Sequence, residues 1–230
     1  MVNIYGTTID QMTEETFDYF LRFLTREKQQ RITRFRFFDD AKRSLLGEIL
    51  TRYAIFKDCN ATMEQMKFDI TMDGKPILQE PSGLHFNISH SGNWVVCAID
   101  DEPIGVDVEA MKPINYDIGE RFFAPKEYCD LINMEEGQRK KYFYMLWTLK
   151  ESYIKAIGKG LAIPLDSFCF TVENGNIMLY QNNEARQYYF WQHEIDIEHI
   201  LSVCAVKPII NGSIEVVELS QLNYKMALAQ

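Results

Sequence analysis

The stretch Ile104-Gly105-Val106-Asp107-Val108-Glu109 decides the fold, because strand-like alternation begins there just after a turn. In a β-strand, alternate side chains point to the same face, so the three apolar residues share one face and the two acids share the other with the glycine. Before this stretch the chain passes from helical to strand-rich segments, and after it the same succession begins again. We therefore expect this strand to open the second half of an α+β protein.

The pattern on either side of this stretch predicts the remaining elements. In the first half we expect a strand over 2–9, a helix capped by Thr13, a basic helix over about 26–34, and a helix capped by Asp39 or Asp40 that runs to about Lys57. Short strands around the Asp73-Gly74 turn and strands over 84–89 and 94–100 complete this half, and the strand over 104–109 opens the second. In the second half we expect a helix with Pro125 in its first turn, a helix over about 138–157 that ends at Gly158, and strands near 167–172, 176–180, 187–192 and 200–206. No low-complexity linker separates the halves, so we expect 1–102 and 103–230 to form one compact unit.

Charge is distributed unevenly along the chain. The 230 residues carry 24 Lys and Arg against 33 Asp and Glu, a net charge of −9. Segment 22–52 has nine basic and four acidic residues and so carries +5, which leaves −14 for the rest. The overall acidity argues against a general nucleic-acid binder. The basic segment fits a site for a small anion and a pair of solvated helices equally well.

Several common chemistries lack support in the sequence. The five cysteines contain no C-x-x-C pair, the four histidines form no H-E-x-x-H, and neither a Walker loop nor G-x-S-x-G occurs. The longest apolar stretch, 94–99, is far shorter than a membrane span, and the first ten residues lack the pattern of a signal peptide. We therefore expect a cytoplasmic protein without a membrane partner, in which a hard cation held by carboxylates is compatible with the sequence.

Three polar clusters are candidates for a functional site. Asp107 and Glu109 share a strand face, where they suit a magnesium ion or are two solvated acids. Glu151 and Lys155 lie four residues apart in a predicted helix, which suits a site or an ordinary surface ion pair. The segment 87–91 offers several hydrogen-bond donors for a phosphate, although its residues are also ordinary turn formers. Together these clusters indicate metal-assisted phosphoryl-type transfer without a protein nucleophile.

Five motifs in a fixed order resemble the Sfp-type 4′-phosphopantetheinyl transferases. They are Gly74-Lys75-Pro76, Phe86-Asn87-Ile88-Ser89-His90-Ser91, Gly105-Val106-Asp107-Val108-Glu109, Arg121-Phe122-Phe123 with Glu127, and Trp147-Thr148-Leu149-Lys150-Glu151-Ser152-Tyr153-Ile154-Lys155, which leads to Gly158-Lys159-Gly160-Leu161. The likeness covers the chain from Ile4 to about Pro208. It implies two pseudo-symmetric α+β halves with coenzyme A between them, the first half contacting its phosphates and the second holding the metal site and docking the carrier.

The resemblance also implies the reaction and its partners. The enzyme transfers 4′-phosphopantetheine from coenzyme A to a serine of an apo peptidyl or acyl carrier and releases 3′,5′-ADP. It thereby activates nonribosomal peptide, polyketide or fatty acid synthases, with antibiotic biosynthesis as a typical setting. The two-half length matches a monomeric enzyme, with Mg²⁺ as cofactor and no nucleic acid or membrane as partner.

Residue roles follow from the same resemblance. Asp107, Glu109 and Glu151 are expected as ligands of Mg²⁺, and Lys155 as a contact to the phosphates and the metal site. Contacts to the phosphates of coenzyme A, including the 3′-phosphate, are expected from Lys28, Arg31, Arg43, Ser44 and His90. Contacts on the adenine side are expected from Gly74, Lys75, Pro76 and Ser89.

The implied mechanism leaves several assignments open. Asp107, Glu151 and Lys155 are the expected catalytic residues, and Glu151, directly or through a metal-held water, removes the proton from the carrier serine. Glu127 either supports the site or stabilises the start of its helix, and Lys150 is either a further phosphate or carrier contact or a surface lysine. The alternatives to the enzyme are a non-catalytic coenzyme A or nucleotide binder and an RNA-binding module on the segment 34–38, where arginine alternates with aromatic residues.

Overall fold

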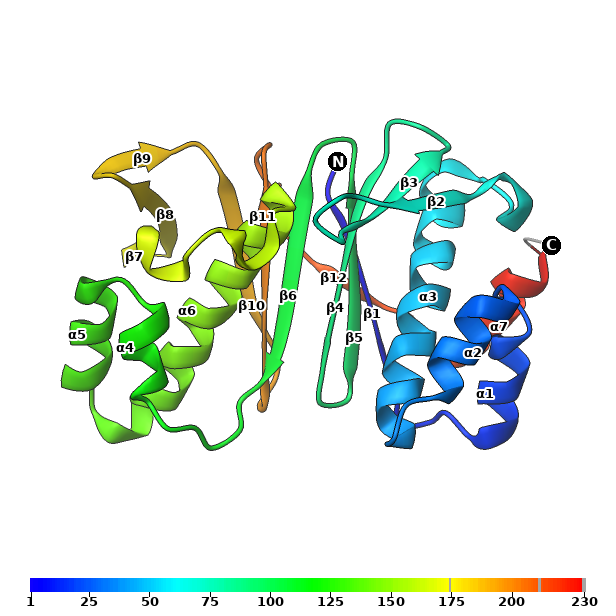
Figure 1. The fold of residues 1–230 in the computed structure, drawn as a ribbon, viewed down its shortest axis with the longest axis horizontal. Helices are drawn as coiled ribbons and strands as arrows, with labels where there is room; N and C mark the ends of the chain where they lie inside the picture. The colour runs from blue at the N-terminus through cyan, green and yellow to red at the C-terminus, as the bar shows by residue number, and fades with distance from the viewer. Residues whose placement is uncertain (174, 211, 229–230) are drawn as a thin grey trace.

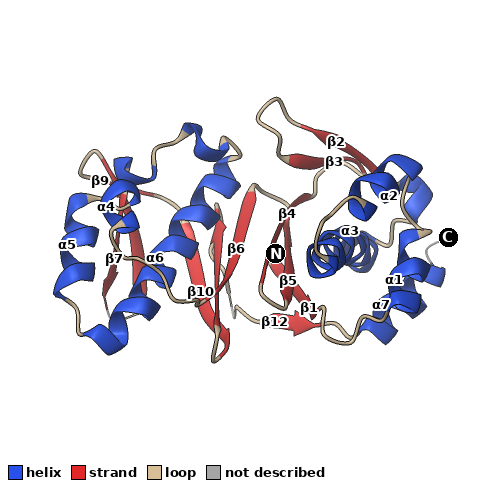
Figure 2. Ribbon diagram, turned by 60° about the horizontal axis from the view of Figure 1, so that its bottom comes forward, coloured by secondary structure: helices blue, strands red, loops and turns tan. Residues whose placement is uncertain are grey.

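The computed structural model describes residues 1–173, 175–210 and 212–228, and it confirms the α+β class. Figure 1 shows one group of helices on each outer side of the molecule and the main strands between them. Figure 2, turned by 60°, shows the same order of layers. Within the described ranges, no helix is long and apolar enough to cross a membrane.

The first group of elements is built mainly by the first hundred residues. It contains β1 (Asn3–Thr8), α1 (Glu14–Leu21), α2 (Arg26–Thr33), α3 (Phe38–Cys59), a 3-10 turn (Met63–Gln65), β2 (Lys67–Ile70), β3 (Pro76–Glu80), β4 (His85–Ser91), β5 (Trp94–Asp100) and, from the end of the chain, β12 (Ile214–Val216) and α7 (Leu219–Leu228). The main sheet has the strand order β12-β1-β5-β4, and α3 packs on it, while β2 and β3 form a separate hairpin.

The second group follows the same succession of helices and strands. It contains β6 (Ile104–Ala110), α4 (Ile118–Phe122), α5 (Pro125–Asn133), α6 (Glu136–Ile157), 3-10 turns at Gly160–Ala162 and Leu165–Ser167, β7 (Cys169–Glu173), β8 (Asn176–Gln181), β9 (Glu184–Arg186), β10 (Tyr189–Asp196) and β11 (His199–Ala205). The sheet β10-β11-β6 packs against α6, and β7, β8 and β9 form a small sheet beside it.

Local sequence signals set most helix ends. The Thr13 hydroxyl accepts a hydrogen bond from the Thr16 amide at 3.2 Å, which caps α1 as expected. Pro125 begins α5, where its missing N–H costs no helical hydrogen bond. Gly158 ends α6 with φ of 79°, a left-handed conformation that glycine adopts without steric cost. These expectations are confirmed.

The expected cap of α3 is wrong. The helix begins at Phe38 with Phe37 as its N-cap residue, so Asp39 and Asp40 lie inside the first turn. There their carboxylates interact favourably with the positive end of the helix dipole without capping it. The earlier start is supported by a tertiary contact, because the Phe38 ring packs edge-on against Phe17 of α1 with the centroids 5.1 Å apart.

The end of the chain returns to the first group of elements. Strand β12 pairs in parallel with β1, and Leu222 of α7 is buried in the core beneath α3. The sequence after Pro208 contains no pattern that predicts these elements. Their position depends on a strand partner about 210 residues earlier in the chain, which local periodicity does not reveal.

A third core joins the two groups. The apolar face of β6, formed by Ile104, Val106 and Val108, packs against Val96 and Ala98 of β5, as the alternation in this strand predicts. The opposite face of β6 meets α6, and Gly105 allows the contact: a Cβ atom there would lie 2.0 Å from the Ser152 carbonyl oxygen. Strand β6 is therefore held between the two groups, with its acidic residues next to α6.

Candidate active site

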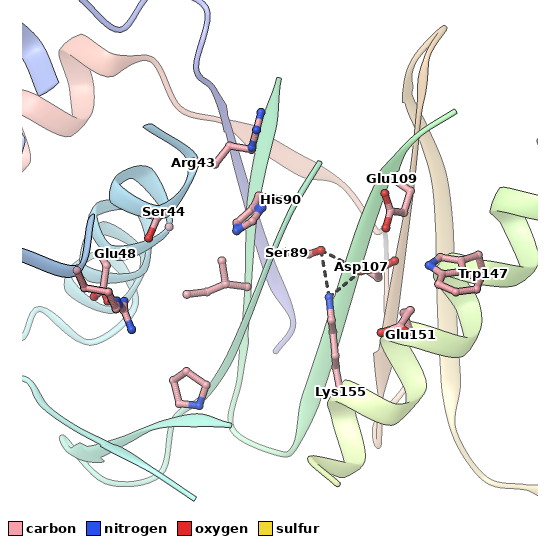
Figure 3. A pocket seen from close by; sticks show the side chains of 14 residues that line it. Arg43, Ser44, Glu48, Ser89, His90, Asp107, Glu109, Trp147, Glu151 and Lys155 are labelled. Carbon is pink, nitrogen blue, oxygen red and sulfur yellow. Dashed lines mark hydrogen bonds and ion pairs between the residues drawn. The ribbon is translucent and has the colours of Figure 1, made fainter. Parts of the chain in front are cut away.

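A cleft of about 470 Å³ opens where the two groups of elements meet. Figure 3 shows side chains of α3 on one side, β4 and β6 in the middle and α6 on the other, all pointing into this cleft. Ten of the residues expected to act line it together: Arg31, Arg43, Ser44, Pro76, Ser89, His90, Asp107, Glu109, Glu151 and Lys155. Residues that are more than 120 positions apart in the chain thus meet in one cavity.

Side chains of β4 hold β6 in register beside the cleft. The Val106 amide donates to Asn87 Oδ1 at 2.8 Å, the Val108 amide to Ser89 Oγ at 3.3 Å, and the Ala110 amide to Ser91 Oγ at 3.1 Å. Because strand side chains alternate, these three β4 residues share one face and meet every second amide of β6. The polar segment 87–91 therefore has a structural role in joining the two groups, which its turn-like composition does not indicate.

Asp107 lies at the centre of the cleft. Its Oδ1 accepts hydrogen bonds from the Ser89 hydroxyl at 2.9 Å and from the Lys155 ammonium at 2.7 Å, and the ammonium also donates to Ser89 Oγ at 3.1 Å. Dashed lines in Figure 3 mark this triangle. The other carboxylate oxygen, Oδ2, is buried and has no hydrogen-bond partner. A buried anionic oxygen without a partner is costly, so Asp107 has one free ligand position.

Two further carboxylates face the same space. Glu109 Oε2 accepts a hydrogen bond from the Ser91 hydroxyl at 2.6 Å, and Glu151 comes from α6 on the opposite side. Burial raises the pKa of all three carboxyl groups; the Asp107 charge raises the pKa of Glu109 and Glu151 further, and Lys155 opposes the rise at Asp107. One ammonium among three carboxylates leaves an excess of negative charge.

This donor set fits a hard cation. Oxygen ligands from carboxylates are what Mg²⁺ prefers, and the partnerless Oδ2 of Asp107 offers one. In the described part of the chain, no three Asp, Glu, His or Cys side chains are already placed to hold a metal ion. Lys155 occupies the other Asp107 oxygen and Ser91 only one oxygen of Glu109, so each acid keeps an oxygen for a cation, and the carboxylates must move closer together to share one.

Cationic groups line the opposite wall of the cleft. The Arg43 guanidinium donates to the Gly92 carbonyl at 2.7 Å and pairs with Asp40, which directs it across the end of β4. Burial lowers the pKa of His90, and the nearby Arg43 and Lys155 charges lower it too. Ser44 adds a hydroxyl from α3. This wall suits an anionic ligand, whereas the carboxylate wall suits a cation.

A second cavity of about 340 Å³ adjoins the cleft and shares Arg31, Glu48, Pro76 and Ile88 with it. Lys28 lines only this second cavity. Neither cavity is lined by Gly74 or Lys75. The Lys75 ammonium instead donates to the carbonyls of Ile104, Lys155 and Ala156, at 3.2, 2.6 and 3.3 Å, and so ties the β2–β3 hairpin to the end of α6.

Glu127 and Lys150 lie outside both cavities and form a buried ion pair. The side chains are 2 % and 0 % exposed, and Lys150 Nζ lies 2.8 Å from Glu127 Oε2. Lys150 also donates to the Leu165 and Phe168 carbonyls, while Glu127 accepts from the Ala124 and Phe170 amides. The interpretation of Lys150 as a phosphate, carrier or surface residue is therefore wrong, and Glu127 stabilises the start of its helix. The positions of Glu127 and Lys150 in the sequence do not indicate that both side chains are fully buried.

Comparisons with known proteins agree with this geometry. Residues 11–102 match a family model described as 4′-phosphopantetheinyl transferase, N-terminal, and residues 103–204 match the 4′-phosphopantetheinyl transferase superfamily. The chain is 37 % identical to the 4′-phosphopantetheinyl transferase Sfp of Bacillus subtilis (strain 168) over 223 residues, which cover 96 % of this chain and all of that protein. The chain belongs to the 4′-phosphopantetheinyl transferase superfamily.

More distant relatives extend this result. The chain is 35 % identical to the 4′-phosphopantetheinyl transferase gsp of Aneurinibacillus migulanus, over 93 % of this chain and 90 % of that protein. It is 29 % identical to the L-aminoadipate-semialdehyde dehydrogenase-phosphopantetheinyl transferase of Mus musculus, over 82 % and 69 %. Coenzyme A-dependent transfer to carrier proteins is the reaction of this family, and the chain is an enzyme of that class. The resemblance found in the motifs is thus confirmed.

Sequence reasoning missed Glu48, which lines both cavities among the basic residues of α2 and α3. A signal was present. Glu48 and Arg52 lie four residues apart in the predicted helix, and Glu48 is the only acid between Asp40 and Arg52.

Proposed function

We propose that this enzyme transfers 4′-phosphopantetheine from coenzyme A to the serine of an apo peptidyl or acyl carrier with Mg²⁺ held by Asp107, Glu109 and Glu151. The metal assignment rests on the buried Asp107 Oδ2, which has no hydrogen-bond partner. It lies in the same cleft as the carboxylates of Glu109 and Glu151, whose pKa values are also raised. When bound there, Mg²⁺ supplies positive charge that stabilises negative charge on phosphate oxygens.

The opposite wall supports binding of coenzyme A. Arg31, Arg43, Ser44 and His90 line the cleft opposite the carboxylates, and Lys28 lines the adjoining cavity. We assign these five residues to the phosphates of coenzyme A, including the 3′-phosphate. The adenine side is assigned to Gly74, Lys75, Pro76 and Ser89, of which Pro76 and Ser89 line the cleft.

The reaction requires a proton acceptor and positive charge at the leaving group. Glu151 is assigned as the base, directly or through a metal-held water, because its carboxylate lines the cleft beside Asp107 and can accept a proton there. It takes the proton of the carrier serine as the serine oxygen attacks the β-phosphorus of coenzyme A. The bond from this phosphorus to the bridging oxygen breaks, and 3′,5′-ADP leaves. Lys155, 2.7 Å from Asp107, is assigned to the phosphate oxygens.

The broader setting belongs to the same proposal. Expected site residues from both halves of one chain meet in the cleft, which supports a monomer as the working form. We assign coenzyme A phosphate binding to residues 1–102 and the metal site and carrier docking to residues 103–230. Activation of nonribosomal peptide, polyketide or fatty acid synthases, as in antibiotic biosynthesis, and a cytoplasmic location without nucleic-acid or membrane partners complete the proposal.

Mass spectrometry tests the reaction directly. The protein is incubated with coenzyme A, Mg²⁺ and a panel of apo peptidyl and acyl carriers, and each carrier is examined for one added phosphopantetheine. Addition that needs Mg²⁺ and is lost with a chelator supports the proposal. Coenzyme A binding without modification of any carrier would instead support a non-catalytic binder.

The metal ligands are tested with Asp107→Ala, with coenzyme A binding and turnover measured separately. Loss of a hard-cation ligand should cost more than about 1 kcal/mol, so turnover should fall well beyond about threefold. A matched control is Asp117→Ala, which removes an aspartate that does not line the cleft. Turnover of Asp107→Ala within threefold of the wild type would show that Asp107 is not a ligand.

The 3′-phosphate assignment is tested with Arg43→Ala. This variant should weaken binding of coenzyme A far more than binding of dephospho-coenzyme A. Arg36→Ala is the matched control, because Arg36 is exposed and forms no ion pair with described residues. Equal losses for both ligands in Arg43→Ala would rule out the assignment.

A further inference from the structure

Glu48 of α3 places a carboxylate among the cations assigned to coenzyme A. Its Oε2 lies 2.6 Å from Lys28 Nζ and 2.7 Å from Arg52 Nη1, and its Oε1 lies 3.2 Å from Arg31 Nη2. We call these four residues the Glu48 cluster. The Glu48 side chain lines both cavities, and Figure 3 shows it on the α3 side of the cleft, opposite the carboxylates of β6 and α6.

The three cations of the cluster differ in how firmly they are held. Arg52 is 9 % exposed, lies one turn after Glu48 on the same helix and also donates to the Glu48 carbonyl oxygen at 2.8 Å. Its guanidinium and the Lys28 ammonium both lie over the Phe68 ring, 4.9 and 5.3 Å from the centroid, so this contact does not distinguish them. Lys28 and Arg31 belong to α2, are 28 % and 60 % exposed and line the ligand cavities. Arg52 is thus the most buried of the three cations and contacts both the backbone and the side chain of Glu48, whereas Lys28 and Arg31 are exposed enough to turn toward a ligand.

The charge of the cluster matches one phosphate monoester. Three cations and one carboxylate leave two positive charges, and a phosphate monoester carries about two negative charges at neutral pH because its second pKa is about 6. Each phosphate of the pyrophosphate bridge carries only one negative charge. The 3′-phosphate is therefore the single phosphate group of coenzyme A whose own charge balances the Glu48 cluster, and only the two pyrophosphate phosphates together carry the same charge.

We infer that Glu48 is a specificity-determining residue that competes with the 3′-phosphate for Lys28 and Arg31. A ligand with a phosphate monoester displaces the Glu48 carboxylate from both cations, and Arg52 then neutralises Glu48. A ligand without this group leaves the cations paired with Glu48. The competition also limits the affinity for 3′,5′-ADP, which carries the same monoester and must leave after each turnover. This inference rests on the proposed phosphate contacts.

The test compares the binding of 3′,5′-ADP with that of dephospho-coenzyme A, which carries no phosphate monoester, to the wild type and to Glu48→Gln by calorimetry. Glu48→Gln removes the competing charge but retains the size of the side chain, so 3′,5′-ADP should bind about fivefold more tightly, or about 1 kcal/mol. Binding of dephospho-coenzyme A should change by less than twofold. Glu27→Gln is the matched control, because Glu27 lines the same second cavity beside Lys28 but forms no ion pair with described residues.

The outcomes separate the alternatives. Weaker binding of 3′,5′-ADP to Glu48→Gln would show that Glu48 only holds the cations in place. Equal tightening of both ligands would show a general effect of charge, and so would a change in Glu27→Gln as large as that in Glu48→Gln. Each result overturns the inference. If Glu48→Gln does not fold, Glu48→Asp serves instead: its shorter side chain withdraws from α2, and 3′,5′-ADP should bind at least twofold more tightly, while no change or weaker binding overturns the inference.

The proposed function is checked separately in the same experiment. Failure of the wild type to bind coenzyme A or to modify any carrier would contradict the proposed function before any variant is compared. A wild type that binds and transfers, together with an unaltered preference in Glu48→Gln, would contradict only the role of Glu48. In steady-state assays the inference also requires the KM for coenzyme A to fall in Glu48→Gln.

Discussion

Replacing Gly105 with alanine tests how the catalytic strand is placed against its helix. A Cβ atom at position 105 of β6 would lie 2.0 Å from the Ser152 carbonyl oxygen and 2.4 Å from the Ala156 amide nitrogen. These two atoms belong to one turn of α6, so the methyl group would press on helix backbone rather than on a flexible side chain. The strand and the helix must therefore separate.

The magnitude follows from these distances. Cβ contacts below 3.0 Å essentially do not occur, so β6 and α6 must move apart by at least about 1 Å. The hydrogen bond between Lys155 and Asp107, now 2.7 Å long, joins the same two elements and would be stretched beyond hydrogen-bonding range. Overpacking of this kind costs about 1–3 kcal/mol, and we expect about 3 because the methyl group would meet helix backbone rather than a side chain that can move. A 1 Å misplacement of reacting groups costs about 10²-fold in rate.

The assay measures both quantities on the same sample. Urea denaturation gives the free energy of unfolding, and kcat/KM for phosphopantetheinylation is measured well below the melting temperature, where the variant is folded. Gly137→Ala is the matched control: it makes the same change in α6 at a position where a Cβ atom meets nothing within 4 Å. Alanine there should stabilise the protein by about 0.5–1 kcal/mol through helix propensity.

The reasoning fails if Gly105→Ala loses less than about 1 kcal/mol and retains kcat/KM within threefold of the wild type. Such a result would mean that the separation of strand and helix is absorbed without moving Asp107 relative to Lys155. A large loss of stability with unchanged kcat/KM would separate packing from catalysis and would also refute the predicted displacement of the site.

Two further predictions concern charged groups of the structure. Lys150→Met should lower the free energy of unfolding by about 3–5 kcal/mol, because it leaves the Glu127 carboxylate buried without its cation. Urea denaturation measures this loss, and a loss below about 1 kcal/mol would contradict the prediction. Burial raises the pKa of Glu48, but the charges of Arg52 and Lys28 outweigh burial, so the pKa of Glu48 is lowered in the folded protein. The ionised Glu48 therefore stabilises the fold above its unfolded pKa of about 4.3, and this stabilisation is lost as the pH falls through its folded pKa. The difference in unfolding free energy between wild type and Glu48→Gln should therefore shrink below about pH 4, and a constant difference between pH 6 and pH 3 in thermal unfolding would exclude this.

Much of the fold could be predicted because it depends on short-range patterns. Alternation in 104–109 predicts the strand, its apolar face and the shared face of Asp107 and Glu109, and these features are present in β6. The cap at Thr13 and the end of α6 at Gly158 are local in the same sense. The four-residue spacing of Glu151 and Lys155 places both on one side of α6, and both line the cleft.

Other features depend on contacts between distant parts of the chain. Thr148, Lys150 and Ser152 also carry polar side chains, but all three are fully buried, and Lys150 is paired with Glu127. Strand β12 is defined by its pairing with β1 rather than by its own three residues. The N-cap residue of α3 is Phe37 rather than an aspartate, because the helix begins at Phe38, whose ring packs on Phe17. No local pattern encodes these contacts, because burial depends on which elements pack together.

The sequence by itself determined the family, the α+β class and the order of the motifs, because these depend on residue identity and on periodicity within single elements. Only the tertiary structure decided that Lys155 and Ser89 share one oxygen of Asp107 and leave the other without a partner. It alone brought Glu48 between the cations of α2 and Arg52. The physical reason is that pairing and desolvation of charges depend on distances through space, and these exist only once β4, β6, α3 and α6 have packed together.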